Sequence, residues 1–244
     1  MKKYLLSEEN IFGQSVGRSL NEVAPKILEQ QTIYGQHVVL HALTDNKNLN
    51  DEWIDQIWDA VQSEPDQRCW TYLPYQGFES KTLLEEKLKT NFGFAGSFHY
   101  LIEVNKQIVG WVALINIRPE HRAVEIGNVY FSHRMKQSTA STETIFQLLK
   151  FCFENHYRRV EWKCDSLNEP SKNAALRFGF TYEGMFRQDR IAKSRNRNTT
   201  WFSILDEEWL PLEKAYSAWL AESNFDQDNQ QKLKLNDFIK LYSN

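Results

Sequence analysis

The stretch that decides the fold is Glu161–Gly184, which reads EWKCDSLNEPSKNAALRFGFTYEG. It opens with β-rich residues, and Asn168 and Ser171 then stand three residues apart at the point where a helix would begin. Gly179 is typical of the left-handed cap that ends a helix. A second β-rich run follows over Phe180–Arg187. The stretch therefore predicts a strand, a short helix and another strand in succession.

Upstream of this stretch, a β-rich segment runs directly into a long helical pattern. The predicted strand is Ala123–Phe131, and the predicted helix is Ser138–Asn155, where apolar residues recur at three- and four-residue steps. Two further β-rich runs, Phe98–Val104 and Ile108–Ile117, are separated by a short polar turn and predict a hairpin. These segments together predict three antiparallel strands followed by a helix.

The same patterns predict further elements on both sides: strands at 37–43 and 200–205, and helices that begin near 50, 79 and 206. This order excludes a doubly wound parallel sheet and a barrel. It predicts an α/β (α+β) domain with a mixed, mostly antiparallel sheet of about seven strands flanked by helices. We expect an N-terminal extension packed on the domain (1–36), the domain itself (37–222), and a polar, helical C-terminal tail (223–244).

Composition restricts the function classes. The 244 residues carry a net charge of −3, which argues against a general nucleic-acid or membrane-surface binder. The three cysteines are widely spaced and predict no disulfide framework, and the six histidines show no metal-ligand spacing. No stretch is apolar enough for a signal peptide or a membrane span. We therefore expect a cytoplasmic protein without a metal.

The start of the long helix is a candidate anion site. A helix N-terminus presents unpaired N–H groups and the positive end of the helix dipole, which suits a phosphate. The small residues there let a ligand approach the backbone, and a lysine adds positive charge; the segment is Lys136, Gln137, Ser138, Thr139, Ala140 and Ser141. An ordinary Ser/Thr-rich helix cap is the alternative interpretation.

The chain resembles the GNAT N-acetyltransferases, in the branch that contains the RimJ/RimL-type ribosomal-protein N-terminal acetyltransferases. The matching segments occur in the same order between about Val38 and Trp209: Trp70–Pro74, Val109–Trp111, Val124–Gly127, Thr142–Glu143, Arg159–Cys164, Asn168 with Ser171, Ala174–Ala175, Phe178–Phe180, Glu183–Gly184, Phe186–Arg187 and Trp201–Ile204. The resemblance implies the GNAT acyl-CoA N-acyltransferase fold and acetyl-CoA as cosubstrate.

The resemblance also implies roles for particular residues. The strand that ends at Phe131 would pair through its main chain with the pantetheine arm of the cofactor. The family's pyrophosphate motif falls on Lys136–Ser141, where Lys136, Thr139 and Ser141 replace the usual Gln/Arg, Gly and Gly/Ala. Asn168 would bond the pantetheine or the substrate backbone, and Ser171 would lie near the cofactor sulfur. The resemblance also implies that the acetyl group is transferred directly from the cofactor to the amine, without an acetyl-enzyme intermediate.

An attacking amine must be neutral, although its pKa of roughly 8 to 10 leaves it mostly protonated. The enzyme therefore needs a proton acceptor and donors for the oxyanion and the thiolate. Glu125, which we favour, and Glu161 are the candidate acceptors, with a carboxylate paired to a nearby arginine on the sheet as the alternative for Glu125. Ser171 is the candidate donor to the sulfur, or a plain helix cap.

Residues for the acceptor substrate are expected in two places. Trp70, Tyr72 and Tyr75 lie in the loop that the family uses to wall the acceptor site, with buried loop packing as the alternative. Arg187 belongs to a basic hairpin, which is either solvated or an anion site for an acidic substrate. Glu161 is also counted among the acceptor-binding residues.

Two functions follow from this sequence. The first is an N-acetyltransferase that acts on a primary amine, either a protein N-terminus or a small amine-bearing molecule. The alternative is a GNAT-fold protein that binds CoA as a sensor or scaffold and has lost catalysis, which the altered phosphate motif suggests. Nucleic acid and membranes are not expected as partners. The polar extensions suggest contacts with a second copy in a homodimer.

Overall fold

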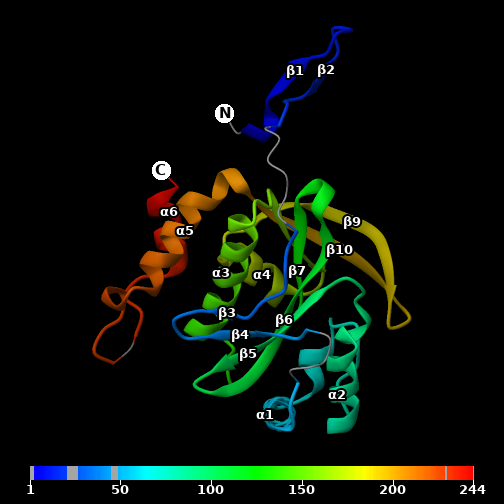
Figure 1. The fold of residues 1–244 in the computed structure, drawn as a ribbon, viewed down its shortest axis with the longest axis vertical. Coiled ribbons are helices and arrows are strands. Elements are labelled where there is room, and N and C mark those ends of the chain that lie inside the picture. The colour runs from blue at the N-terminus through cyan, green and yellow to red at the C-terminus, as the bar shows by residue number, and fades with distance from the viewer. Residues whose placement is uncertain (1–2, 21–26, 45–48, 229, 244) are drawn as a thin grey trace.

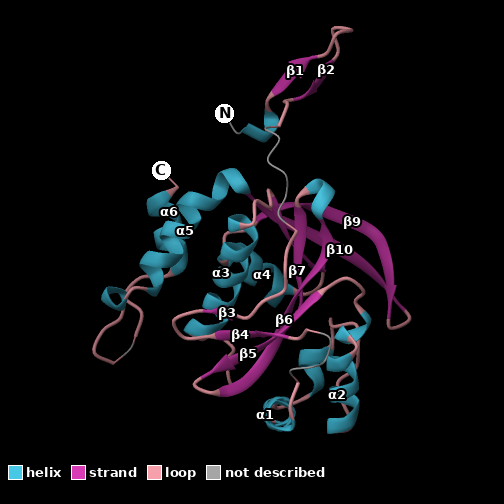
Figure 2. Ribbon diagram, viewed as in Figure 1, coloured by secondary structure: helices cyan, strands magenta, loops and turns pink. Residues whose placement is uncertain are grey.

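The computed structural model describes residues 3–20, 27–44, 49–228 and 230–243 (Figures 1 and 2). Its strands are β1 (Ser7–Glu9), β2 (Ser15–Gly17), β3 (Ile33–Tyr34), β4 (Val39–Ala42), β5 (Phe98–Val104), β6 (Gln107–Arg118), β7 (Ala123–Phe131), β8 (Arg159–Asp165), β9 (Thr181–Ala192) and β10 (Arg195–Leu205). Its α-helices are α1 (Asp51–Gln62), α2 (Lys81–Lys89), α3 (Thr139–Glu154), α4 (Glu169–Arg177), α5 (Asp206–Leu220) and α6 (Leu235–Tyr242), and the short helices used below are η2 (Gln67–Trp70) and η5 (Glu222–Asn224).

In the described part of the chain, eight strands form the main sheet in the order β3-β4-β5-β6-β7-β8-β10-β9. Neighbouring strands are antiparallel except β7 and β8, which are parallel and joined through α3. The predicted mixed, mostly antiparallel sheet flanked by helices is thus confirmed. The sheet has one strand more than the seven expected, because the two-residue strand β3 is too short to show an alternating pattern.

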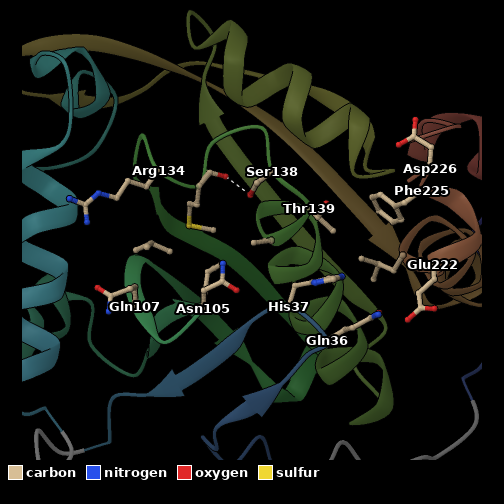
Figure 3. A pocket seen from close by; sticks show the side chains of 15 residues that line it. Gln36, His37, Asn105, Gln107, Arg134, Ser138, Thr139, Glu222, Phe225 and Asp226 are labelled. Carbon is tan, nitrogen blue, oxygen red and sulfur yellow. Dashed lines mark hydrogen bonds between the residues drawn. The ribbon is translucent and has the colours of Figure 1, made fainter. Parts of the chain in front are cut away.

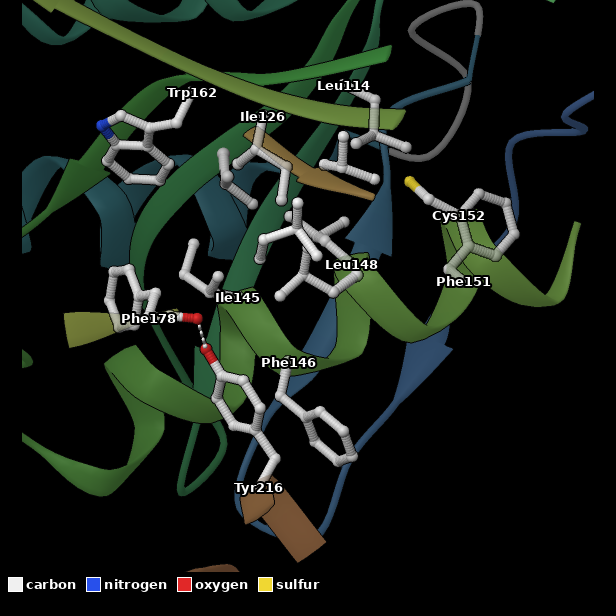
Figure 4. Packing of buried hydrophobic residues seen from close by; sticks show 14 of the residues in the cluster. Leu114, Ile126, Ile145, Phe146, Leu148, Phe151, Cys152, Trp162, Phe178 and Tyr216 are labelled. Carbon is white, nitrogen blue, oxygen red and sulfur yellow. Dashed lines mark hydrogen bonds between the residues drawn. The ribbon is translucent and has the colours of Figure 1, made fainter. Parts of the chain in front are cut away.

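Helices cover both faces of the sheet because successive strand residues point to opposite sides. Leu101 of β5 and Trp111 of β6 pack with α1 and α2, whereas the adjacent Tyr100 and Val112 belong to the cluster that α3 and α5 cover. In that larger cluster, the α3 side chains Ile145, Phe146 and Leu148 pack beneath the sheet (Figure 4). The sheet therefore separates two hydrophobic cores.

The chain ends behave differently from each other. In the segment expected to pack on the domain, β1 and β2 form their own two-stranded sheet with every strand residue exposed, and Figure 1 shows this hairpin standing away from the main sheet. A short two-stranded ribbon has no second layer to bury its side chains. The C-terminal α6 instead packs on α5, and its Leu235 is buried in the larger core. Among the described residues, every helix is too short or too polar to cross a membrane.

Candidate active site

The sheet opens between its two parallel strands. β7 and β8 pair only over Ala123–Glu125 and Arg159–Glu161, although β7 continues to Phe131 and β8 to Asp165. Beyond Glu125 the two strands part, and the β8 side of β7 has main-chain groups without a strand partner. Such an edge can pair with an extended ligand. We call this opening the wedge, and Glu125 and Glu161 lie at its apex.

The start of α3 lies at one side of the wedge mouth. Ser138 is the N-cap: its hydroxyl accepts from the Ser141 amide (3.3 Å) and donates to the Met135 carbonyl (2.7 Å). The Ser141 hydroxyl donates back to the Ser138 carbonyl (2.7 Å). The amides of Thr139 and Ala140 have no hydrogen-bond partner among the described residues. The expected cap is thus present, and two N–H groups remain available to an anion.

Lys136, which the sequence analysis assigned to a phosphate, is engaged elsewhere. Its Nζ lies 2.9 Å from a carboxylate oxygen of Glu64, the residue that also accepts from the Tyr130 hydroxyl and the His133 amide. Glu64 follows α1, so this ion pair holds the loop before α3 against the α1 face of the sheet. Gln137 beside it is exposed and has a left-handed backbone (φ 59°).

A cavity of about 910 Å³ lies along the N-terminus of α3 (Figure 3). Ser138, Thr139 and Ala140 line it, together with residues of the β3–β4 turn, the β5–β6 turn and η5. Arg134 also lines it, is exposed, and has no ion pair among the described residues. The sequence analysis missed Arg134, although its position two residues before Lys136 was a signal. Arg134 thus has no ion pair among the described residues, whereas Lys136 has one, and Figure 3 shows the Arg134 guanidinium pointing away from Ser138 and Thr139.

The second helix start, at α4, lies at the end of β8. The Asn168 Oδ1 accepts from the Ser171 amide (3.2 Å), so Asn168 is the N-cap and its Nδ2 has no partner in the described chain. The Ser171 hydroxyl accepts from the Trp162 Nε1 (3.0 Å) and also has a hydrogen-bond contact with the Cys164 thiol. Asn168 is therefore the cap of α4, whereas Ser171 lies inside the first turn and its hydroxyl caps no main-chain amide.

The two carboxylates at the wedge apex are ion-paired. Glu125 lies 2.9 Å from the Lys163 Nζ and accepts from the Asn116 amide (2.5 Å). Glu161 lies 3.0 Å from the same Nζ and also pairs with Arg118 and Arg159. The side chains of Glu125, Glu161 and Lys163 are all less than a tenth exposed. The paired-carboxylate interpretation of Glu125 is what the geometry shows.

The pKa of Glu161 reports this arrangement. Burial by itself would raise the pKa, but hydrogen bonds from Arg118, Arg159 and Lys163 outweigh it and lower the pKa to about 2. A carboxylate with so low a pKa is a weak proton acceptor at neutral pH. Glu161 therefore fits the role of a charge that holds its neighbours better than the role of a base.

The aromatic loop that was expected to bind the acceptor is largely core. Trp70 is buried and stacks on Tyr130 with ring centroids 4.8 Å apart, and the partly buried Tyr75 packs against Trp111 and Phe92. The alternative of loop packing thus describes both rings. Tyr72 keeps more than a third of its surface exposed and is the aromatic of this loop best able to contact an acceptor.

Two contacts tie this loop across the wedge. The Tyr72 hydroxyl donates to the Leu167 carbonyl (3.0 Å), just before α4. Lys193, at the turn between β9 and β10, donates to the Trp70 carbonyl (2.7 Å). The loop, the start of α4 and the hairpin turn thus meet around one opening. Arg187 lies on the same hairpin, exposed and without an ion pair among the described residues, so it is not part of this junction.

A buried hydrogen-bond chain that the sequence analysis missed runs beneath this loop. The Trp111 Nε1 donates to the Tyr75 hydroxyl (3.1 Å), which donates to the Asn128 Oδ1 (2.8 Å). The Asn128 Nδ2 lies 3.0 Å from the His99 Nε2, and the His99 Nδ1 lies 3.1 Å from the Ser97 hydroxyl. Single polar residues among apolar strand residues carry no recognisable sequence signal.

The direction of this chain sets the protonation of His99. An amide nitrogen can only donate, so the His99 Nε2 accepts from Asn128, and the neutral ring carries its proton on Nδ1. Asn128 itself has a left-handed backbone (φ 46°) at the β-bulge where β6 and β7 shift register. The chain therefore holds the bulge of β7 within the free edge of the wedge.

We expect the stability of the protein to fall as the pH drops from about 6.5 to about 4, because burial lowers the pKa of His99 to about 4. The folded pKa lies below the unfolded value, so the unfolded state binds the proton first, and stability is lost as the pH falls. The loss is on the order of 3 kcal/mol. Urea unfolding across this pH range measures it. A His99→Gln variant should lose this part of the dependence; an unchanged dependence would contradict the assignment.

In the described part of the chain, no group of three or more His, Cys, Asp or Glu side chains is arranged to hold a metal ion. What the site offers is an open strand edge, available main-chain N–H groups at the start of α3, the Asn168 Nδ2 at the start of α4, and a buried ion-paired carboxylate at the apex. These groups suit an extended, anionic ligand that ends near Glu125.

Comparisons with known proteins agree with this geometry. The family profile described as an acetyltransferase (GNAT) domain matches residues 44–181. A GCN5-related N-acetyltransferase from Brucella melitensis is 34% identical, with a TM-score of 0.84 over 91% of this chain and 100% of that one. A probable GNAT-family acetyltransferase from Chromobacterium violaceum is 33% identical, with a TM-score of 0.70 over 79% of this chain and 96% of that one. No curated protein sequence matches.

A more distant structure shares the fold alone. It is the acetyltransferase from Salmonella typhimurium that modifies the N-terminal serine of the ribosomal protein L7/L12, with 17% identity and a TM-score of 0.57 over 70% of this chain and 96% of that one. The family profile spans the wedge, both helix starts and the aromatic loop. The protein is an acetyltransferase, and its chain belongs to the GNAT family, whose members transfer acetyl groups from acetyl-CoA.

Proposed function

We propose that this enzyme transfers the acetyl group of acetyl-CoA directly to a primary amine, in a ternary complex and without an acetyl-enzyme. The observation that carries the proposal is the early end of β7–β8 pairing, which opens the sheet where α3 and α4 both begin. An extended cosubstrate with an anionic end fits an open strand edge that leads to a helix N-terminus.

The residues that would hold acetyl-CoA follow from their available donors. The main chain of β7 up to Phe131 would pair with the pantetheine arm, and the amides of Thr139 and Ala140 would bind the diphosphate. Arg134 would supply the positive charge at this site, because Lys136 is already ion-paired with Glu64. The Nδ2 of Asn168 would donate to a pantetheine carbonyl.

The chemistry would take place at the wedge apex. As the amine nitrogen forms its bond to the acetyl carbon, the carbon–sulfur bond breaks, and the amine proton passes to Glu125, through water where the gap requires it. Lys163 and Asn116 hold the Glu125 carboxylate in place for this transfer. Ser171 donates its hydroxyl proton toward the departing thiolate.

The acceptor would enter beneath the junction of the aromatic loop, the start of α4 and the β9–β10 turn. Tyr72 is the exposed aromatic there, and Trp70 and Tyr75 support its loop from the core. Glu161 and Arg187 remain proposed acceptor contacts, Glu161 from the apex and Arg187 from the hairpin rim. A protein N-terminus is one acceptor to test, because the Salmonella structure of the same fold acts on one.

We also propose residues 37–222 as the GNAT domain, with the segments before and after it as additions. A cytoplasmic location is supported by the three cysteines, all of them free thiols, since reducing compartments keep thiols unpaired.

The test is release of free CoA thiol when the purified protein is incubated with acetyl-CoA and one amine at a time. The panel holds a peptide with an N-terminal serine, the same peptide with a blocked N-terminus, and small primary amines. We expect thiol release above the acceptor-free background for at least one unblocked amine, with a mass gain of one acetyl group on it. Binding of CoA without acetylation of any amine would count against the transfer reaction.

A further inference from the structure

The N-terminal hairpin carries an excess of uncovered apolar side chains. We call residues 3–20, which include β1 and β2, the arm. Ile11 and Phe12 at its tip are 92% and 79% exposed. The other exposed apolar side chains of the arm are Tyr4, Leu5, Leu6, Val16 and Leu20.

An arm of this kind needs a covering surface. A two-stranded hairpin is marginally stable by itself in water, and contiguous exposed apolar side chains mark interaction sites. The turn of the hairpin is nevertheless closed by hydrogen bonds: the Asn10 side chain accepts from the main-chain amides of Phe12 (2.9 Å) and Gln14 (3.0 Å). The tip is therefore presented in a defined shape, outward from its own domain (Figure 1).

A receiving surface is present on the same chain. A second cavity, of about 900 Å³, lies at the end of β7 and β8 opposite the wedge, among the starts of both strands and the adjoining ends of β9 and β10. Arg122 and Arg158 line it, and neither side chain has a hydrogen bond or ion pair among the described residues. Tyr182 and Leu205 add apolar surface.

The arm and this cavity are complementary in charge. β1 carries Glu8 and Glu9, both exposed, and Glu9 has no partner in the described chain. Two unpaired arginines facing a cavity suit carboxylates of this kind. The lining also holds Glu120, Glu161, Glu183 and Glu208. Glu161 and Glu183 pair with Arg159, and Glu120 pairs with His121, so Arg122 and Arg158 are left to receive the acidic groups of the arm.

The base of the arm lies at the rim of the cavity, since Tyr4 and Leu20 also line it. The tip of the same arm points away and stays exposed, so the chain does not fill its own cavity. In a two-fold dimer the same patch of both copies meets at the axis. Because the base of each arm lies beside the cavity, the arm of one copy would have only a short distance to cross to reach the cavity of the other copy.

We propose that the protein forms a two-fold dimer in which each copy places its arm in the Arg122–Arg158 cavity of the other. The interface lies at the starts of β7 and β8, at the end of the sheet opposite the wedge mouth, and Glu161 of the wedge apex is among its lining residues. A partner of different sequence is the competing outcome of the test.

The experiment exchanges charges and reads mass by analytical ultracentrifugation. The first variant, E8R/E9R, reverses the arm, and the second, R122E/R158E, reverses the cavity. We expect wild-type protein at twice the 28.9 kDa chain mass and each variant alone as a monomer. Mixing the two variants should restore the dimer, because each arm then meets a cavity of opposite charge on the other chain. Within either chain of the mixture, arm and cavity still repel.

Further variants control for folding. I11D/F12D should weaken dimerisation by about 100-fold or more, since two apolar side chains lose their cover. An I27D variant places one aspartate at an exposed apolar site outside the arm and should stay dimeric. Circular dichroism establishes that each variant is folded. Three results would each overturn the proposed arm-exchanged dimer. The wild-type protein could be a monomer, the charge-reversed variants could all remain dimeric, or their mixture could stay monomeric.

Discussion

Replacing Glu125 by glutamine is expected to lower kcat by about 10²- to 10⁴-fold, because the amine proton loses its acceptor at the wedge apex. The amide keeps the size of the side chain and can still bond Asn116. In the proposed binding mode the cosubstrate is held by main-chain groups and helix starts away from this carboxylate, so the affinity for acetyl-CoA should remain. The measurement is steady-state thiol release together with calorimetry of CoA binding.

The matched control for this change is Glu120→Gln. Glu120 lies five residues earlier, at the turn before β7, and its side chain is well exposed. Its replacement should leave kcat unchanged. If Glu125→Gln keeps the wild-type kcat while remaining folded, the proton leaves by another route and Glu125 is only a partner for Lys163.

Replacing Lys163 by methionine is expected to reduce the free energy of unfolding by about 3–5 kcal/mol, since it removes the shared cation of two buried carboxylates. The Lys163 Nζ lies 2.9 Å from Glu125 and 3.0 Å from Glu161, and it also sits 3.7 Å from the centre of the Trp201 ring. Methionine fills a similar volume, so the loss reports the charge rather than a cavity. Urea unfolding at neutral pH measures it.

Lys172→Met is the comparison for this prediction. Lys172 pairs with the exposed Glu169 one helical turn away, and such surface pairs contribute about 0–1 kcal/mol. An equal loss for both variants would contradict the buried cluster.

The low pKa of Glu161 adds a second readout: its folded pKa of about 2 lies below the unfolded value near 4.3, so its stabilisation is lost as the pH falls below about 4.

Local patterns predicted most elements because their causes are local. The Asn50 cap of α1, the Ser138 cap of α3 and the Asn168 cap of α4 each bond an amide three residues ahead. The start of β10 was placed five residues late, since its first half is charged and exposed and shows no alternation. The arm hairpin was missed for the same reason: it buries neither face.

The candidate site was predictable to the extent that it consists of helix starts and strand ends. The same sequence could not tell that Lys136 is taken by Glu64, which is 72 residues away, or that Arg134 is left unpaired beside the cavity. Nor could it distinguish a base from a paired carboxylate at Glu125, because that depends on Lys163 from the neighbouring strand.

By itself, the sequence determined the family, the order of the strands and helices from β4 to α5, and the two helix starts that flank the wedge, since each rests on residues a few positions apart. Only the tertiary structure decided which polar groups meet. Glu143 of α3 accepts from the His37 amide across 106 residues, and Asn128 joins Tyr75 to His99 between two strands and a loop. Such pairings depend on the register of the strands and on which groups become buried, and no short stretch of sequence encodes either. Burial and the paired charges then raise or lower the pKa of each group.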